Sequence, residues 1–206
     1  MAVVHEASDA FNVREHGHHH DEDALRIFGF WIFLTSDLIL FACLFATYVI
    51  LSNHTGSGPT PADMFDVPAF TAETIILLTS SFTCGLATFA MHHGRRGLML
   101  TWLIVTLLLG LAFVGLEASE FTRNALAGAT MQRSAFLSAF YTLVGTHGCH
   151  VSFGILWMTS ILIQAWRKGL AGEIPGKVFI VGLYWHFLDV VWVFIFTVVY
   201  LMGVMR

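Results

Sequence analysis

The sequence predicts an all-α membrane protein, a bundle of five transmembrane helices. Of its 206 residues, 56% are hydrophobic and only 12% are charged, whereas about 25% of the residues in a typical soluble domain are charged. The mean hydropathy is +0.73, and the charged residues lie between long apolar segments. A water-soluble enzyme of this composition would lack the polar surface needed to cover its core.

Five apolar segments are long enough to cross the bilayer as helices. A hydrocarbon core about 30 Å thick needs about 20 predominantly apolar residues per helix. We expect spans near residues 25–50, 69–92, 97–122, 135–167 and 177–203. The connections between them are short and carry Gly, Pro and basic residues, which are typical of turns. They leave no room for a second domain, so residues 25–206 should form one five-helix membrane domain.

The basic residues predict the orientation of these helices. They are Arg14, Arg26, Arg95, Arg96, Arg167, Lys168 and Lys177 on one side, and Arg123, Arg133 and Arg206 on the other. Cytoplasmic loops carry an excess of Lys and Arg. The N-terminus should therefore be cytoplasmic, and the C-terminus should lie outside after an odd number of spans.

The first 24 residues form a polar, histidine-rich segment ahead of the first span. Its histidines resemble a metal-binding tract only by composition, because a tail without fixed structure has no preformed ligand geometry. They are His16, His18, His19 and His20. We expect a solvated cytoplasmic tail without a metal site.

Ionisable side chains near the middle of three spans are the most informative residues. They are Asp37 in the first span, His147 and His150 in the fourth, and His186 and Asp189 in the fifth. A charged aspartate at the centre of a membrane helix costs about 2.5–3.5 kcal/mol, so these groups should face the bundle interior or a protein partner. Because residues three apart share a helix face, each pair can touch. We expect one buried polar cluster that joins the three spans.

The function of this cluster is open to several interpretations. It could relay protons or bind a ligand, or it could fix the helix register through hydrogen bonds, which is a common role in membrane bundles. A haem held by His186 with His147 or His150 is a weaker idea, because Asp189 stands beside His186 and no second histidine pair matches. No Lys/Arg-rich block supports nucleic-acid binding. We therefore assign no catalytic, cofactor or metal site to the chain.

Two further sets of residues predict contacts. Three carboxyl groups fall toward the outer ends of the second and third spans, where hydration lowers the cost of charge, and we expect lipid or interface contacts for them. They are Glu73, Glu117 and Glu120. Small residues recur at steps of three and four along the fourth span and predict a seam for close helix packing. They are Ala135, Ser138, Thr142, Gly145, Cys149 and Ser152.

Four motifs resemble subunit III of the haem-copper oxidases. They are Phe28–Leu38, Gly115–Phe121, Gly145–Val151 and Tyr184–Trp192, and they follow one another in the family's order. The resemblance extends over all five spans, residues 25–203. Within the family, the five-span length, the His-rich tail and the loop at residues 58–68 are most similar to subunit III of bacterial cytochrome o ubiquinol oxidases.

This resemblance implies an accessory subunit without redox centres of its own. Its complex would oxidise ubiquinol, reduce oxygen to water and pump protons across the bacterial inner membrane. Haems and copper would lie in catalytic subunit I, which this chain would stabilise and support in proton uptake, with subunits II and IV as further partners and with bound phospholipid. Asp37 matches the family's carboxyl-reagent-sensitive residue, usually Glu, and the HGxH and WHFxD motifs match His147, His150, His186 and Asp189. Subunit III of a cytochrome c oxidase and an independent proton carrier remain as alternatives.

Overall fold

The computed structural model describes residues 2–55, 67–170 and 172–204, with side chains from Leu25 onward. Its elements in chain order are α1 (Ala2–Leu51), α3 (Val67–His92), α4 (Arg96–Leu126), the 3-10 turn η1 (Met131–Arg133), α5 (Ala135–Lys168), α6 (Ile174–Ile195), the π-helical segment η2 (Phe196–Leu201) and α7 (Met202–Val204). Every regular element in the described ranges is helical. The all-α prediction is therefore confirmed for these residues.

Within the described ranges, five helices are long and apolar enough to cross a membrane. They are Leu25–Leu51, Val67–His92, Arg96–Leu126, Ala135–Lys168 and Ile174–Leu201. A long apolar helix thus lies at each of the five expected spans, with boundaries that differ by a few residues. The largest difference is at the end of α4, which continues through residues 123–126, where we expected a connection. The helix continues because the next residue suited to stop it, Gly128 with a φ of +82°, comes later.

Helix α1 begins well before the first span. It starts at Ala2, where we expected a solvated tail, and it contains no proline to interrupt its backbone hydrogen bonds. The side chains of the histidine tract lie outside those that the structure describes. The chain divides into two compact units, the first ending at Leu38 and the second beginning at Ile39. Helix α1 therefore contributes residues to both units.

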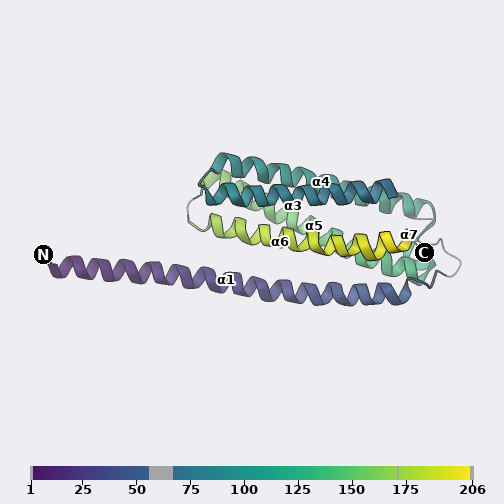
Figure 1. Cartoon of the computed structure of the whole chain (residues 1–206), viewed down its shortest axis with the longest axis horizontal. Coiled ribbons are helices and arrows are strands. Elements are labelled where there is room, and N and C mark those ends of the chain that lie inside the picture. The colour runs from purple at the N-terminus through teal and green to yellow at the C-terminus, as the bar shows by residue number, and fades with distance from the viewer. Residues whose placement is uncertain (1, 56–66, 171, 205–206) are drawn as a thin grey trace. The chain divides into compact units, whose positions relative to one another are not determined.

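Helices α3, α4, α5 and α6 of the second unit lie alongside one another (Figure 1). Helix α3 packs against α4 and α6, and α5 packs against the same two helices. A tight turn joins α3 to α4 at Gly94, whose φ of +67° suits glycine. At the start of α5, the Ser134 hydroxyl accepts a hydrogen bond from the Leu137 backbone N–H at 3.1 Å. The turn and the cap place consecutive helices side by side.

The core of this unit is centred on a tryptophan of α6 that reaches three other helices. A methyl group added at Gly110 of α4 would lie 2.8 Å from Cη2 of Trp185, and one added at Gly154 of α5 would lie 3.2 Å from its Cζ3. The Trp185 indole N–H donates to the Ser80 hydroxyl of α3 at 3.0 Å. The two glycines therefore make room for the indole, and the hydroxyl satisfies its polar atom.

The predicted seam of small residues lies on the outward side of α5. Ala135, Ser138, Thr142 and Cys149 are exposed, and Gly145 and Ser152 are partly exposed. The buried side of α5 carries larger side chains, including Phe136, Phe140 and Val151. Larger side chains make more van der Waals contacts, which favours their placement against α4 and α6. Close packing of the seam against a partner helix stays a prediction.

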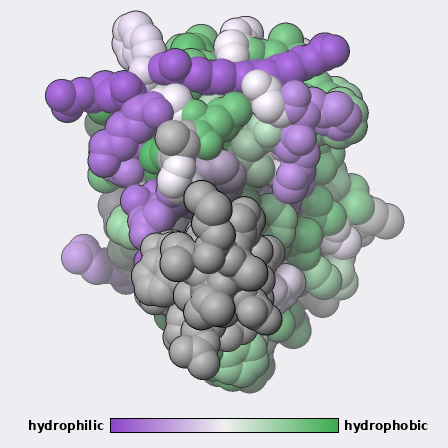
Figure 2. All heavy atoms as spheres, turned by 90° about the vertical axis from the view of Figure 1, so that its left-hand side faces the viewer, coloured by the Kyte–Doolittle hydropathy of each residue, from purple (hydrophilic) through white to green (hydrophobic). Residues whose placement is uncertain are grey.

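Hydrophilic side chains gather at the end of the bundle where α3 joins α4 and α5 joins α6 (Figure 2). Arg95, Arg96, Arg167 and Lys168 are exposed at these connections. The Arg96 guanidinium also donates a hydrogen bond to the backbone carbonyl of Trp166, which ties the start of α4 to the end of α5. The bundle therefore has a distinctly basic end.

Candidate functional site

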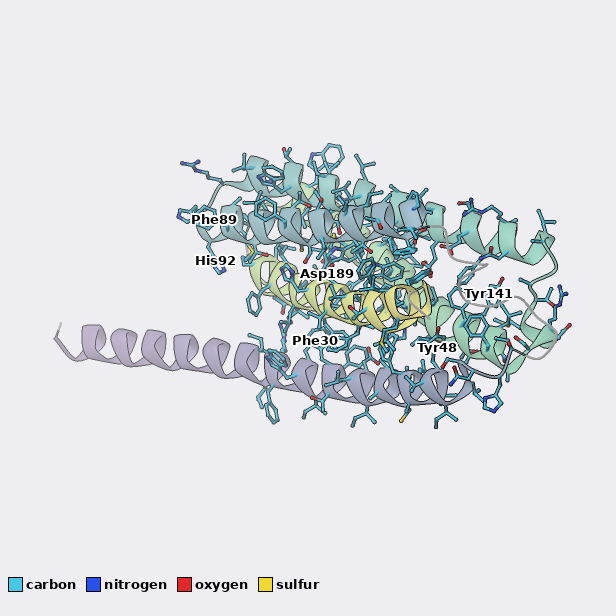
Figure 3. All side chains as sticks on the ribbon, turned by 45° about the vertical axis from the view of Figure 1, so that its right-hand side comes forward. Phe30, Tyr48, Phe89, His92, Tyr141 and Asp189 are labelled. Carbon is cyan, nitrogen blue, oxygen red and sulfur yellow. The ribbon has the colours of Figure 1, made fainter. Side chains whose placement is uncertain are left out.

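Asp189 of α6 lies about midway along the bundle. Figure 3 shows Asp189 between Phe89 and His92, toward one end, and Tyr48 and Tyr141, toward the other. A polar group at the middle of a membrane helix has no water to bind, so its hydrogen bonds must come from the protein. The partners of each group therefore indicate its role.

His147 connects α5 to α6 inside the core. Its side chain is fully buried, and its Nε2–H donates to the backbone carbonyl of Leu188 at 3.2 Å. The imidazole packs against Trp192, at 5.2 Å between ring centroids, and edge-on against Phe113 at 5.9 Å. These contacts fix the position of α5 against α6 and α4.

His150 lies one turn further along α5 and bonds within its own helix. Its Nδ1–H donates to the Thr146 carbonyl at 2.7 Å, and its ring lies 5.2 Å from that of Phe41. The Tyr184 hydroxyl of α6 donates to the backbone carbonyl of His150 at 3.2 Å. This turn of α5 is therefore bound to α6 through its backbone.

His186 and Asp189 face α3. The Ser81 hydroxyl lies 2.7 Å from Nδ1 of His186, and either group can donate the hydrogen bond, depending on the imidazole tautomer. Ser81 also interacts electrostatically with the Asp189 carboxyl group. Both members of the predicted pair thus interact with a residue of α3, which the motif did not reveal.

The structure places the members of the predicted cluster against different neighbours. His147 bonds the backbone of α6, whereas His186 bonds Ser81 of α3. Asp37 belongs to the first unit, and its neighbour Thr35 donates to a carbonyl of its own helix, that of Trp31, at 2.9 Å. A single cluster that includes Asp37 stays a prediction.

A groove opens beside the residues that join α3 and α6. Its volume is about 310 Å³, and it is lined by Leu78, Ser81, Phe82, Gly85, Leu86, His186 and Asp189. Its walls are mostly apolar, while the two ionisable side chains of α6 are partly exposed in it. We call it the α3–α6 groove.

The three glutamates near the outer ends of α3 and α4 are buried. Glu73, Glu117 and Glu120 expose 2%, 5% and 4% of their surface, although we expected contacts with lipid or the interface. The helices turn these side chains inward, and Gly148 of α5 makes room for one of them, because a methyl group there would lie 2.6 Å from Oε2 of Glu117. Glu73 also interacts electrostatically with Arg123. The carboxyl groups are therefore part of the interior.

The arrangement of histidines bears on the haem hypothesis. A haem between α5 and α6 would need imidazoles that face each other from the two helices. His147 turns toward the α6 backbone, and His186 turns toward α3. Among the described side chains, no three His, Cys, Asp or Glu residues lie together as metal ligands would. These two histidines thus lack the geometry for a shared haem.

Sequence comparisons assign this arrangement to a known family. The family described as cytochrome c oxidase subunit III matches residues 9–204. The chain belongs to this family. It is 49% identical over 197 residues to the cytochrome bo(3) ubiquinol oxidase subunit 3 of Pseudomonas aeruginosa, over 95% of this chain and 94% of that relative. It is 51% identical over 179 residues to the quinol oxidase subunit 3 of Bacillus subtilis, over 87% and 88% of the two chains.

Membership of the subunit III family confirms the resemblance that the four motifs predicted. A third relative, the probable quinol oxidase subunit 3 of Staphylococcus aureus, is 49% identical over 184 residues, 88% of this chain and 91% of that one. Together with the five helices of the described ranges that are long and apolar enough to cross a membrane, the family identifies this subunit III chain as a multi-pass membrane protein.

Sequence reasoning missed the hydroxyl residues of α3 that serve this subunit III fold. The Trp192 indole N–H donates to the Thr74 hydroxyl at 3.1 Å, and Ser80 and Ser81 bond Trp185 and His186. The signal was present, because hydroxyl side chains in a membrane span often hydrogen-bond across helices. It was weak, because such hydroxyls can also bond their own backbone.

Proposed function

We propose that the chain is the non-catalytic accessory subunit III of a proton-pumping terminal quinol oxidase. The observation that carries this proposal is its identity of about one half, over nearly the whole length, to relatives named as quinol oxidase subunit 3. In this proposal, catalytic subunit I holds the haems and copper, oxidises ubiquinol and reduces oxygen to water. This chain stabilises subunit I and supports its proton uptake, alongside subunits II and IV.

The contacts in the bundle support a structural role. One ring N–H each of His147, Trp185 and Trp192 donates to an acceptor on a neighbouring helix. Groups engaged in this way hold helices in register. The buried polar residues of the WHFxD and HGxH motifs then stabilise a rigid scaffold on which the catalytic subunit packs.

We further propose that the protein lies in the bacterial inner membrane with a cytoplasmic N-terminus and a periplasmic C-terminus. The basic end of the bundle supports this orientation, because Lys and Arg are enriched on the cytoplasmic side. A bound phospholipid belongs to the same proposal. Its headgroup would lie at an end of the bundle, where the polar headgroup region of the bilayer meets the helices.

Purification from native membranes tests the assignment. The chain, tagged at its C-terminus and extracted in a mild detergent, should bring haem-copper subunits with it in a fixed ratio. A reduced-minus-oxidised absorption spectrum of the eluate measures the haem. An unrelated tagged membrane protein from the same membranes is the control. Recovery of this chain alone, without haem, would contradict the proposal.

The electron donor is tested on the same preparation. The purified complex should consume oxygen with ubiquinol and not with reduced cytochrome c. Oxygen consumption with cytochrome c alone would assign the chain to a cytochrome c oxidase, while leaving its role as subunit III intact.

A further inference from the structure

The α3–α6 groove leaves two ionisable side chains partly exposed at mid-membrane depth. His186 and Asp189 line it about halfway along the bundle. Ionisable residues in membrane helices almost always face protein or a water-filled cavity, because lipid chains offer no hydrogen bonds. Ser81 hydrogen-bonds His186 on one side of the pair, and both side chains line the open groove. This position requires cover by something other than lipid tails.

The floor of the groove suits a closely packed helix. Ser81 and Gly85 lie four residues apart on α3, the spacing of small residues that lets two membrane helices approach closely. A methyl group added at Gly85 would meet no atom within 4 Å. The walls are large apolar side chains, with Leu78 45% and Phe82 68% exposed. The small residues at the floor leave room for a second helix to approach closely, and the large apolar side chains of the walls can pack on either side of it.

Four occupants come into question, and the geometry separates them. Water would find few polar partners, because the walls of the groove are mostly apolar. A lipid chain would fill the apolar walls but would leave His186 and Asp189 without a new polar partner. A second copy docked groove to groove would bring two Asp189 carboxyl groups together at mid-membrane depth, which like-charge repulsion disfavours. A helix of a different protein can place a small or hydrogen-bonding side chain over Gly85 and meet the polar pair.

We propose that the α3–α6 groove is the docking site for a transmembrane helix of another subunit of the oxidase. This inference rests on the proposed function, which supplies the partner subunits. The docked helix places a small residue against Gly85 and a hydrogen-bonding side chain near His186 and Asp189. The two ionisable groups then lie inside a protein interface, as the cost of their burial demands.

Photo-crosslinking in intact membranes tests the occupant directly. Phe82, on the exposed wall, is replaced by benzoylphenylalanine, the membranes are irradiated, and adducts of this chain are identified by mass spectrometry. We expect an adduct with a membrane helix of one oxidase subunit. An adduct with lipid only, or with a second copy of this chain, would overturn the proposal.

A variant whose side chain fills the groove tests the docking independently. Gly85→Leu adds a side chain where the chain itself has open space, so it should keep the normal amount of this chain in the membrane. The added group prevents close helix approach, and we expect at least about a tenfold loss of the cross-linked subunit from the purified complex after detergent washing. Gly115→Leu on α4, at another exposed glycine with open space, is the matched control and should retain that subunit.

The outcomes separate this inference from the proposed function. Unchanged retention in Gly85→Leu, with the wild-type complex intact, would overturn the docking site alone. If the unmodified tagged chain brought no haem-copper subunits, the proposed function itself would fail. If Gly85→Leu lowered the amount of this chain in the membrane, the cross-link at Phe82 would still decide the question.

Discussion

Helix α6 presents two faces that differ in burial and in partners. Trp185, Leu188 and Trp192 face the interior and expose at most 2% of their surface, and both indoles donate to hydroxyls of α3. His186 and Asp189, from the same motif, are partly exposed in the α3–α6 groove. Neighbouring residues of one motif therefore serve different purposes.

The difference follows from helix geometry. Residues at 185, 188 and 192 follow steps of three and four, so they share one face, while 186 and 189 lie on the next. Changes on the interior face should lower the stability of the chain itself. Changes on the groove face should act mainly on assembly. Each prediction below tests one side of this division.

The largest effect is expected where the interior face is tightest. Gly110→Leu would drive its side chain into the Trp185 ring, which already lies 2.8 Å from the position of an added methyl group. Extra methylene groups in a packed core cost about 1–3 kcal/mol, and a whole isobutyl group against the rigid indole should cost more than that and more than any change below. We expect the folded chain to be lost from the membrane, measured by immunoblot and by size exclusion in detergent. Normal amounts of monodisperse protein would show that the interior face is adaptable.

A histidine of α5 that packs against the interior face of α6 and a histidine on the groove face of α6 give the most direct comparison of the two faces. His147→Ala removes a fully buried ring and its hydrogen bond to Leu188, and should lower the free energy of unfolding by about 2–4 kcal/mol. His186→Ala removes a partly exposed ring, and should cost the isolated chain about 1 kcal/mol. Unfolding of the detergent-solubilised chain in increasing SDS, followed by tryptophan fluorescence, measures both. Equal losses would contradict the division between the faces.

Much of the fold could be predicted from the sequence, because bilayer thickness fixes the length of a membrane helix. Glycine also marks helix ends well, as at Gly94 and Gly169, both with positive φ. The sequence did not predict the start of α1 at Ala2, because polar residues without proline are compatible with either a helix or a tail.

The sequence showed which residues are polar or small within the membrane helices, but not which other helices they contact. In a membrane protein, the lipid-facing side of a helix is as apolar as the interior side, so hydrophobicity does not show which face is buried. This ambiguity explains why Glu117 was expected at the interface and lies inside. It also explains why the small residues around Ser138 and Thr142 were expected to pack and are exposed in this chain.

On the groove face, the Ser81 hydroxyl links α3 to α6. Ser81→Ala removes its hydrogen bond to His186, and should lower the free energy of unfolding by about 1 kcal/mol, near the middle of the range for membrane proteins. SDS unfolding measures this loss. Ser36→Ala is a suitable control, because the Ser36 hydroxyl donates to the carbonyl of Phe33 in its own helix. A loss as large as that of His147→Ala would place Ser81 with the interior face.

The smallest effect is expected from a hydroxyl pair away from α6, which sets the scale for the others. Thr83 of α3 and Thr106 of α4 share a hydrogen bond of 2.8 Å in the buried interface. Thr83→Val keeps the shape and removes the hydroxyl, and should cost about 0.6 kcal/mol, the average for such bonds between membrane helices. Thr79→Val is the matched control, since the exposed Thr79 hydroxyl bonds only the Ile75 carbonyl of its own helix. If both variants unfold at the same SDS concentration, hydroxyl pairs between helices do not stabilise this bundle. The larger loss in free energy of unfolding expected for Ser81→Ala must then come from the ionisable side chains beside Ser81.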